Sequence, residues 1–215
     1  GTLLTALPPS EAAQVKAVNA YSKLTLAETP TLFLEFHGTD AGVKEQSERF
    51  GDIAESFGGG PFVWATNPED RTRLWQARHD AYWAAVAMRP GAKGLSTDVC
   101  VPISRLADCV EATEKDIAAF GLISPIVGHV GDGNFHCLPL FDPENAQEMG
   151  RVKAFVRRLV ERAVAMGGTC TGEHGVGQGK AGYLPLEFPP GTLAMMRAIK
   201  SAVDPQGIMN PGKIV

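Results

Sequence analysis

The sequence predicts an α+β domain in which helices cover one side of an antiparallel or mixed sheet. Helix-like and strand-like segments alternate along the 215 residues, without the regular Gly-x-Gly-x-x-Gly turns of a doubly wound parallel sheet. The 44% hydrophobic content is sufficient for a buried core. A domain usually takes roughly 100–200 residues, so we expect residues 1–215 to form one domain.

Hydrophobic spacing and turn residues locate the individual elements. Apolar residues three and four apart predict helices, and short β-branched or alternating runs predict strands. In chain order we expect a helix over 10–23, a strand over 31–37, a helix over 39–57, a short strand over 62–65, a helix over 67–88, a strand over 97–101, a helix over 104–120, a β region with a sharp break over 123–141, and helices over 143–166 and 191–203. Asn67-Pro68 is typical of a helix start and Gly167-Gly168 of a helix end.

The composition argues against several classes of protein. A formal net charge of −4 disfavours nucleic-acid binding, which a basic surface normally accompanies. No apolar run approaches the roughly 18–20 residues that a membrane span needs, and the N-terminus lacks a signal-peptide layout. The four cysteines form no Cys-x-x-Cys pair, which is typical of reduced, buried thiols. We therefore expect a soluble protein of a reducing compartment such as the cytoplasm.

The segment from Gly128 to His136 is predicted to be a β-hairpin that aligns two histidines. Asp132-Gly133 is typical of a two-residue hairpin turn, and folding the chain there pairs His129 with His136. Directly opposite residues share a face with Cβ atoms about 4.5–5.5 Å apart, so both imidazoles could bind one metal ion. Two half-buried histidines without a ligand are the alternative.

The loop over 167–177 is dense in glycine and contains the adjacent pair Glu173 and His174. Glycine permits close backbone approach to a ligand. In an extended loop these two side chains would point opposite ways, so one could face a metal and the other a substrate. Glu173 would complete a His-His-Glu site with open metal positions. A flexible loop after a helix end is the alternative.

Arg78 lies within the helix expected over 67–88. Its guanidinium offers a two-pronged partner for a carboxylate. A solvated charge on the helix surface is the alternative interpretation.

Three motifs together resemble the C-terminal domain of FAD-linked oxidases. They are Gly-His-Val-Gly-Asp-Gly-Asn-Phe-His over 128–136, Thr-Gly-Glu-His-Gly-Val-Gly over 171–177 and Asp-Pro-Gln-Gly-Ile-Met-Asn-Pro-Gly-Lys over 204–213. The family includes D-lactate dehydrogenases of the cytochrome type, the glycolate oxidase D subunit and D-2-hydroxyglutarate dehydrogenase. Residues 77–79, 89–91 and 96–106 look most like the D-lactate dehydrogenases. The resemblance implies a ferredoxin-like antiparallel sheet with helices packed on one face. This is the substrate (cap) domain of a vanillyl-alcohol-oxidase-type flavoenzyme, and no FAD-binding domain is expected within this chain.

The resemblance also implies the roles of particular residues. Zn²⁺ or Mn²⁺ would be held by His129, His136 and Glu173. His174 would be the general base, and Arg78 would bind the substrate carboxylate. Asn210, in the tail, would approach the flavin. FAD would be bound mainly by a separate domain, in cis or as another subunit.

The implied reaction is oxidation of a D-2-hydroxyacid to the 2-oxoacid, with electrons passing to cytochrome c, a quinone or another acceptor. Relatives acting on 2-hydroxyglutarate carry polar or basic groups where this sequence has Tyr82, Ser96 and Leu138. A second carboxylate buried without a cationic partner is costly, so we expect a short or apolar monocarboxylate such as D-lactate. No nucleic acid or membrane span is expected, although a peripheral or, in a eukaryote, mitochondrial location fits the resemblance. The rival interpretations are a non-catalytic metal-binding assembly module, a metallohydrolase, or an oxidase of glycolate or D-2-hydroxyglutarate.

Overall fold

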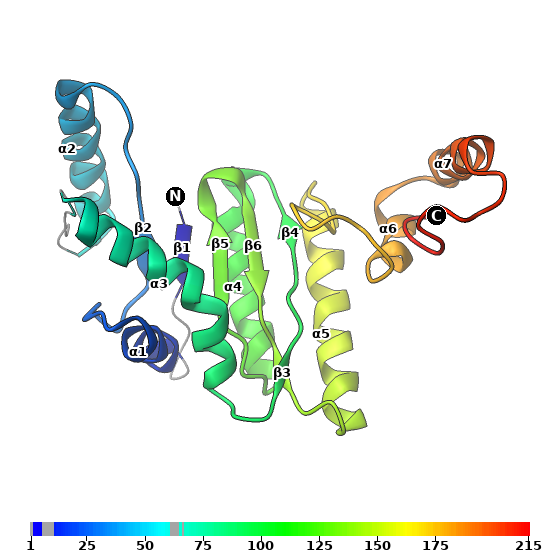
Figure 1. The fold of residues 1–215 in the computed structure, drawn as a ribbon, viewed down its shortest axis with the longest axis horizontal. Helices are drawn as coiled ribbons and strands as arrows, with labels where there is room; N and C mark the ends of the chain where they lie inside the picture. The colour runs from blue at the N-terminus through cyan, green and yellow to red at the C-terminus, as the bar shows by residue number, and fades with distance from the viewer. Residues whose placement is uncertain (1, 6–10, 61–64, 66) are drawn as a thin grey trace.

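The computed structural model describes residues 2–5, 11–60, 65 and 67–215, and Figure 1 shows their arrangement. The elements in chain order are β1 (Thr2–Thr5), α1 (Glu11–Ser22), β2 (Thr31–Phe33), α2 (Asp40–Ser56), α3 (Pro68–Ala87), β3 (Lys93–Gly94), β4 (Val99–Cys100), α4 (Ile103–Ala119), β5 (Ile126–His129), the 3₁₀ turn η1 (Val130–Asp132), β6 (Asn134–Cys137), β7 (Leu140–Phe141), α5 (Ala146–Ala165), the 3₁₀ turn η2 (Ala181–Tyr183), α6 (Leu184–Glu187) and α7 (Pro190–Val203). The α+β class is therefore confirmed.

The main sheet has the strand order β2-β1-β5-β6-β4, and every pair in it is antiparallel. β3 and β7 form a separate antiparallel pair. β1 was not expected from the sequence. It lies between β2 and β5, so its strand character depends on hydrogen bonds to segments far along the chain.

The long helices begin where polar caps place them. Asn67 Oδ1 accepts from the Asp70 N–H at 2.8 Å at the start of α3, and Thr39 caps α2. α5 begins three residues later than expected from Pro143, because Asn145 caps it through two backbone N–H groups. The strand expected over 31–37 is limited to Thr31–Phe33. The strand expected over 62–65 lies almost wholly outside the described residues.

Helices cover both faces of the sheet. On one face Ile126 and Phe135 pack against α4 and α5, including the fully buried Phe155. On the other face Val127 packs with Leu74 and Ala81 of α3. α1 packs in turn against α3 (Figure 1). The helical layer expected on one face is thus present, and the structure adds a second on the face that carries the histidines.

The hairpin register differs from the one expected. His129 pairs with Asn134 and Val127 pairs with His136, because the turn takes four residues instead of two. Of the two expected turn residues only Gly133 has positive φ (+74°), where an added Cβ would lie 2.0 Å from the Val101 carbonyl oxygen. Relative to the expected pairing, the partner of His129 shifts by two residues, from His136 to Asn134. Because two is an even number, His129 and His136 remain on one face of the sheet as diagonal neighbours.

The C-terminal segment extends away from the sheet (Figure 1). Met195, Ile199 and Val203 are exposed on one side of α7. The chain then returns to the glycine-rich loop, where the Ile214 N–H donates to the Gly177 carbonyl at 2.9 Å. Among the described residues no helix combines the length and hydropathy that crossing a membrane requires.

Candidate active site

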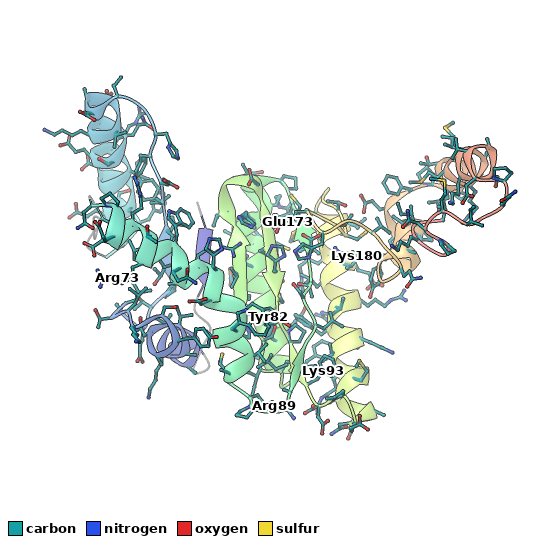
Figure 2. The ribbon with its side chains drawn as sticks, viewed as in Figure 1. Arg73, Tyr82, Arg89, Lys93, Glu173 and Lys180 are labelled. Carbon is teal, nitrogen blue, oxygen red and sulfur yellow. The ribbon has the colours of Figure 1, made fainter. Side chains whose placement is uncertain are left out.

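Four elements bring the candidate residues together at one end of the sheet. His129 ends β5 and His136 lies within β6. Arg78 reaches this end from α3, while Glu173 and His174 come from the loop after α5. Figure 2 shows Glu173 beside the sheet at this end.

Glu173 Oε1 lies among three imidazoles. It is 3.0 Å from His136 Nε2, 3.4 Å from His129 Nε2 and 3.6 Å from His174 Nε2. The His174 ring stacks on His136 with centroids 4.8 Å apart, and the His129 ring meets His136 edge-on at 5.9 Å. The side chains of Glu173 (48% exposed) and His174 (46%) are half-exposed, so the site is open on this side.

The segment before β4 orients His136. The Thr97 carbonyl oxygen lies 2.9 Å from His136 Nδ1, so that nitrogen must carry the proton and donate. Burial lowers the pKa of His136, and this outweighs the opposing effects of the Thr97 hydrogen bond and the carboxylates of Asp98 and Glu173. With the proton on Nδ1, Nε2 is the nitrogen that faces Glu173 and could bind a metal ion.

Arg78 contacts the same group. Its Nη2 lies 3.1 Å from His129 Nε2. A guanidinium has no lone pair, so this nitrogen of His129 accepts and is unprotonated. The lone pairs of both β-hairpin histidines therefore point into one small volume beside a carboxylate.

A buried carboxylate holds the loop that carries Glu173 and His174. Asp98 accepts from the Glu173 N–H at 3.1 Å and from the His174 N–H at 2.9 Å. It also accepts from the Thr171 hydroxyl at 3.2 Å and from Lys180 Nζ at 2.7 Å. Successive N–H groups of an extended chain point opposite ways, so the loop is folded here into an anion-binding turn. This corrects the expectation that Glu173 and His174 diverge: both side chains reach the same cluster.

The surroundings keep Asp98 ionised. Burial alone would raise its pKa, but hydrogen bonds from Lys180, the His174 N–H, Asn134 and the Glu173 N–H outweigh burial and hold the pKa well below the usual range for Asp. The Asn134 amide also donates to the Val99 carbonyl, so it is fixed in place.

The donor set fits a divalent metal ion. The ligand atoms of His129, His136 and Glu173 all lie within 4.8 Å of one another. Ligands bound at 2.0–2.1 Å around a tetrahedral ion are about 3.3 Å apart, and Glu173 Oε1 has nearly this spacing from both nitrogens. Two imidazoles and a carboxylate suit Zn²⁺, Mn²⁺ and related ions.

A second possible ligand group is Asp98, His136 and His174. It fits a metal less well, because the Asp98 oxygens already accept from Lys180 and two backbone N–H groups.

Not every candidate residue joins the cluster. Asn210 is exposed in the tail, and its Oδ1 accepts from Lys213. Leu138 packs with Ala85 in a small apolar cluster, and Tyr82 is exposed on α3. The role of Asn210 toward the flavin therefore remains a prediction.

The sequence reasoning missed the residues that support the site, above all Asp98 and Lys180. A signal existed for Asp98, since it is a charged residue within the apolar segment 97–101. Lys180 lies seven residues after Glu173 in a glycine-rich loop, where spacing alone gives no reason to select it.

Comparison with known proteins places the chain in a family. Residues 3–214 match the family model of "FAD linked oxidases, C-terminal domain". The match covers nearly the whole chain, which therefore belongs to this family.

The most informative relatives are dehydrogenases and oxidase subunits. The chain is 50% identical to "Probable D-lactate dehydrogenase, mitochondrial" of Danio rerio over 94% of its own length and 40% of that protein. It is 42% identical to "D-lactate dehydrogenase [cytochrome], mitochondrial" of Arabidopsis thaliana, covering 94% of the chain and 36% of the relative. Identity to "Glycolate oxidase subunit GlcD" of Bacillus subtilis is 33%, over 92% of the chain and 42% of the subunit. The chain thus spans about two fifths of the length of these relatives.

Solved structures share the fold at low identity. A 4-ethylphenol oxidase from Gulosibacter chungangensis superposes with a TM-score of 0.62 at 20% identity, over 83% of this chain and 37% of that one. A p-cresol methylhydroxylase superposes with a TM-score of 0.58 at 14% identity, over 99% of this chain and 52% of that one. At these identities the likeness shows the fold alone, and both structures share the arrangement of helices and antiparallel sheet of this chain.

Proposed function

We propose that this chain is the substrate-binding domain of an FAD-dependent dehydrogenase that oxidises a short D-2-hydroxymonocarboxylate such as D-lactate. One observation supports this proposal above the others. His129, His136 and Glu173 form a metal-compatible cluster, with the possible base His174 and the carboxylate-binding cation Arg78 both at its edge.

Arg78 is the candidate for binding the substrate carboxylate. It is always charged, and it projects toward the histidine cluster. His129 Nε2 cannot accept from Arg78 and coordinate an ion at once, so metal loading would release the guanidinium toward a substrate.

His174 is the candidate general base. Its half-exposed ring is stacked on His136, which holds Nε2 beside the carboxylate of Glu173. An ion held by His129, His136 and Glu173 would lower the pKa of a substrate hydroxyl, as metal ions do for bound water. His174 then takes the hydroxyl proton from hydrogen-bonding distance.

The redox step requires a flavin that this chain is not expected to bind alone. FAD, held mainly by a flavin-binding domain in cis or as a separate subunit, would accept the hydride from C2 of the substrate. The half-exposed Glu173 and His174 leave an open face for such a domain to cover. Cytochrome c or a quinone would be the final acceptor, and a mitochondrial location follows the printed names of the D-lactate dehydrogenase relatives.

The substrate assignment depends on three uncharged residues at positions where relatives acting on 2-hydroxyglutarate carry polar or basic groups. Tyr82, Ser96 and Leu138 carry no charge, and Leu138 is buried among apolar side chains. The resemblance implies that these positions face the distal group of the substrate, and none of the three side chains could pair with a second carboxylate there. D-lactate is therefore preferred to D-2-hydroxyglutarate.

Anaerobic flavin reduction, followed by absorbance in the complete flavoprotein, tests the proposal. We expect D-lactate to reduce the flavin faster than L-lactate, glycolate or D-2-hydroxyglutarate. His174→Ala should slow reduction by about 10²–10⁴-fold, the usual contribution of a general base. His79→Ala, on the exposed side of α3, is the matched control and should leave the rate unchanged.

Other results would favour the rival interpretations. An unchanged rate in His174→Ala would indicate a non-catalytic metal-binding module. A preference for D-2-hydroxyglutarate would refute the substrate assignment. Elemental analysis would identify the metal as zinc, manganese or another ion.

A further inference from the structure

We propose that Asp98 and Lys180 are positioning residues for the candidate active site, and that they fix the loop that presents Glu173 and His174 to the β-hairpin histidines. This inference rests on the proposed function, because it explains how the two residues reach the site.

Asp98 binds the loop that carries Glu173 and His174. Its side chain has 0% exposure and accepts hydrogen bonds from three groups of the loop: the Thr171 hydroxyl, the Glu173 N–H and the His174 N–H. The backbone atoms of both functional residues are therefore tied to one carboxylate. Neither Glu173 nor His174 is held by a helix or strand of its own.

Lys180 pairs with Asp98 and contacts the same loop. Its ammonium group donates to Asp98 Oδ2 at 2.7 Å, to the Asp98 carbonyl at 3.3 Å and to the Thr171 hydroxyl at 3.2 Å. An ammonium has three donors, and all three are directed into this network. Lys180 thus supplies the charge that balances the fully buried carboxylate of Asp98. It follows Glu173 and His174 in the chain, so it also ties the later part of the loop to Asp98 (Figure 2).

Thr97, next to Asp98 in the chain, orients His136. Its carbonyl fixes the proton of His136 on Nδ1, and its hydroxyl accepts from the Cys137 N–H at 2.7 Å. Thr97 and Asp98 are adjacent, so one dipeptide fixes both the orientation of the His136 ring and the position of the loop that contains Glu173. The Asp98–Lys180 pair therefore fixes the loop relative to the hairpin.

This arrangement predicts a specific loss when the pair is broken. Outer partners of metal ligands commonly change metal affinity or activity by about 10–100-fold when mutated. Lys180→Met, in the complete flavoprotein, should weaken Mn²⁺ and Zn²⁺ binding by at least about tenfold, and should lower kcat for D-lactate more than it changes KM. Lys180→Arg should recover part of both losses.

The matched control is Arg162→Met. Arg162 pairs with Asp116 between α4 and α5, and its side chain is 13% exposed against 17% for Lys180. The control breaks a similarly buried ion pair outside the candidate site. It should lower the melting temperature by a comparable amount while leaving metal affinity within about twofold.

Hydrogen exchange separates this inference from the proposed function. The segment containing Glu173 and His174 should lose amide protection in Lys180→Met but keep it in Arg162→Met, whether or not D-lactate is oxidised. If Lys180→Met loses this protection but the unmodified flavoprotein does not oxidise D-lactate, the positioning role is supported and the proposed function is overturned. Full protection and unchanged metal affinity in Lys180→Met would overturn the positioning role. Asp98→Asn provides a second route to the same readouts; Lys180→Met decides the outcome if Asp98→Asn does not fold.

Discussion

Replacing Gly172 by alanine tests how tightly the Glu173 loop is built. An added Cβ would lie 2.0 Å from Asn134 Nδ2 and 2.8 Å from Asp98 Oδ1. Asn134 cannot swing aside cheaply, because its amide is buried and donates to both Asp98 and the Val99 carbonyl. The loop or the asparagine must therefore move.

These contacts determine how much free energy of unfolding the substitution costs. Forcing an extra methyl group into a packed site costs about 1–3 kcal/mol. Losing a buried hydrogen-bond partner of Asp98 costs about 1–3 kcal/mol more. We expect Gly172→Ala to lower the free energy of unfolding by about 3 kcal/mol, which corresponds to roughly 6–12 °C in melting temperature for a domain of this size.

Urea unfolding measured by circular dichroism checks this value. Gly179→Ala is the control, since it lies in the same loop, has no positive φ, and its Cβ would meet nothing within 4 Å. Its stability should stay within about 0.5 kcal/mol of the unmodified protein. If Gly172→Ala proved as stable as Gly179→Ala, the close packing of the loop on Asp98 and Asn134 would be refuted.

Three further predictions concern the core and the buried ionisable groups. Phe155→Ala should lower the free energy of unfolding by about 3–5 kcal/mol in urea titrations, because the ring has 0% exposure; a loss below about 1 kcal/mol would contradict its place in the core. Burial raises the pKa of the Cys137 thiol to about 12, so iodoacetamide at pH 8 should modify it only after unfolding, as mass spectrometry would show. The pKa of Asp98 is lowered in the folded protein, so its stabilising contribution is present above about pH 4 and is lost as the pH falls below the ordinary Asp value. Acid unfolding curves should show this loss in the unmodified protein, and Asp98→Asn should lack that part of the acid sensitivity.

Local signals in the sequence determined most of the helices. Asn67 and Asn145 have side chains that accept the first free N–H groups of a helix, and such caps act within a few residues. The residues of the site could also be named, because the hairpin and the Glu173-His174 pair have a recognisable pattern. The positive φ of Gly133 is likewise a property of one residue in one turn.

Only the tertiary structure decided how these pieces meet. The register of His129 and His136 depends on the length of the turn and the packing of the strand faces, so the two-residue turn that the sequence favours was wrong. The convergence of Glu173 and His174 depends on Asp98, which lies 75 residues before Glu173. Local sequence patterns involve residues that are close together in the chain. A buried carboxylate must instead be paired with groups that the fold brings close to it, because an unpaired charge in the interior is costly. The sequence thus determined which groups are available, and the pairing of buried charges and strands determined where they point.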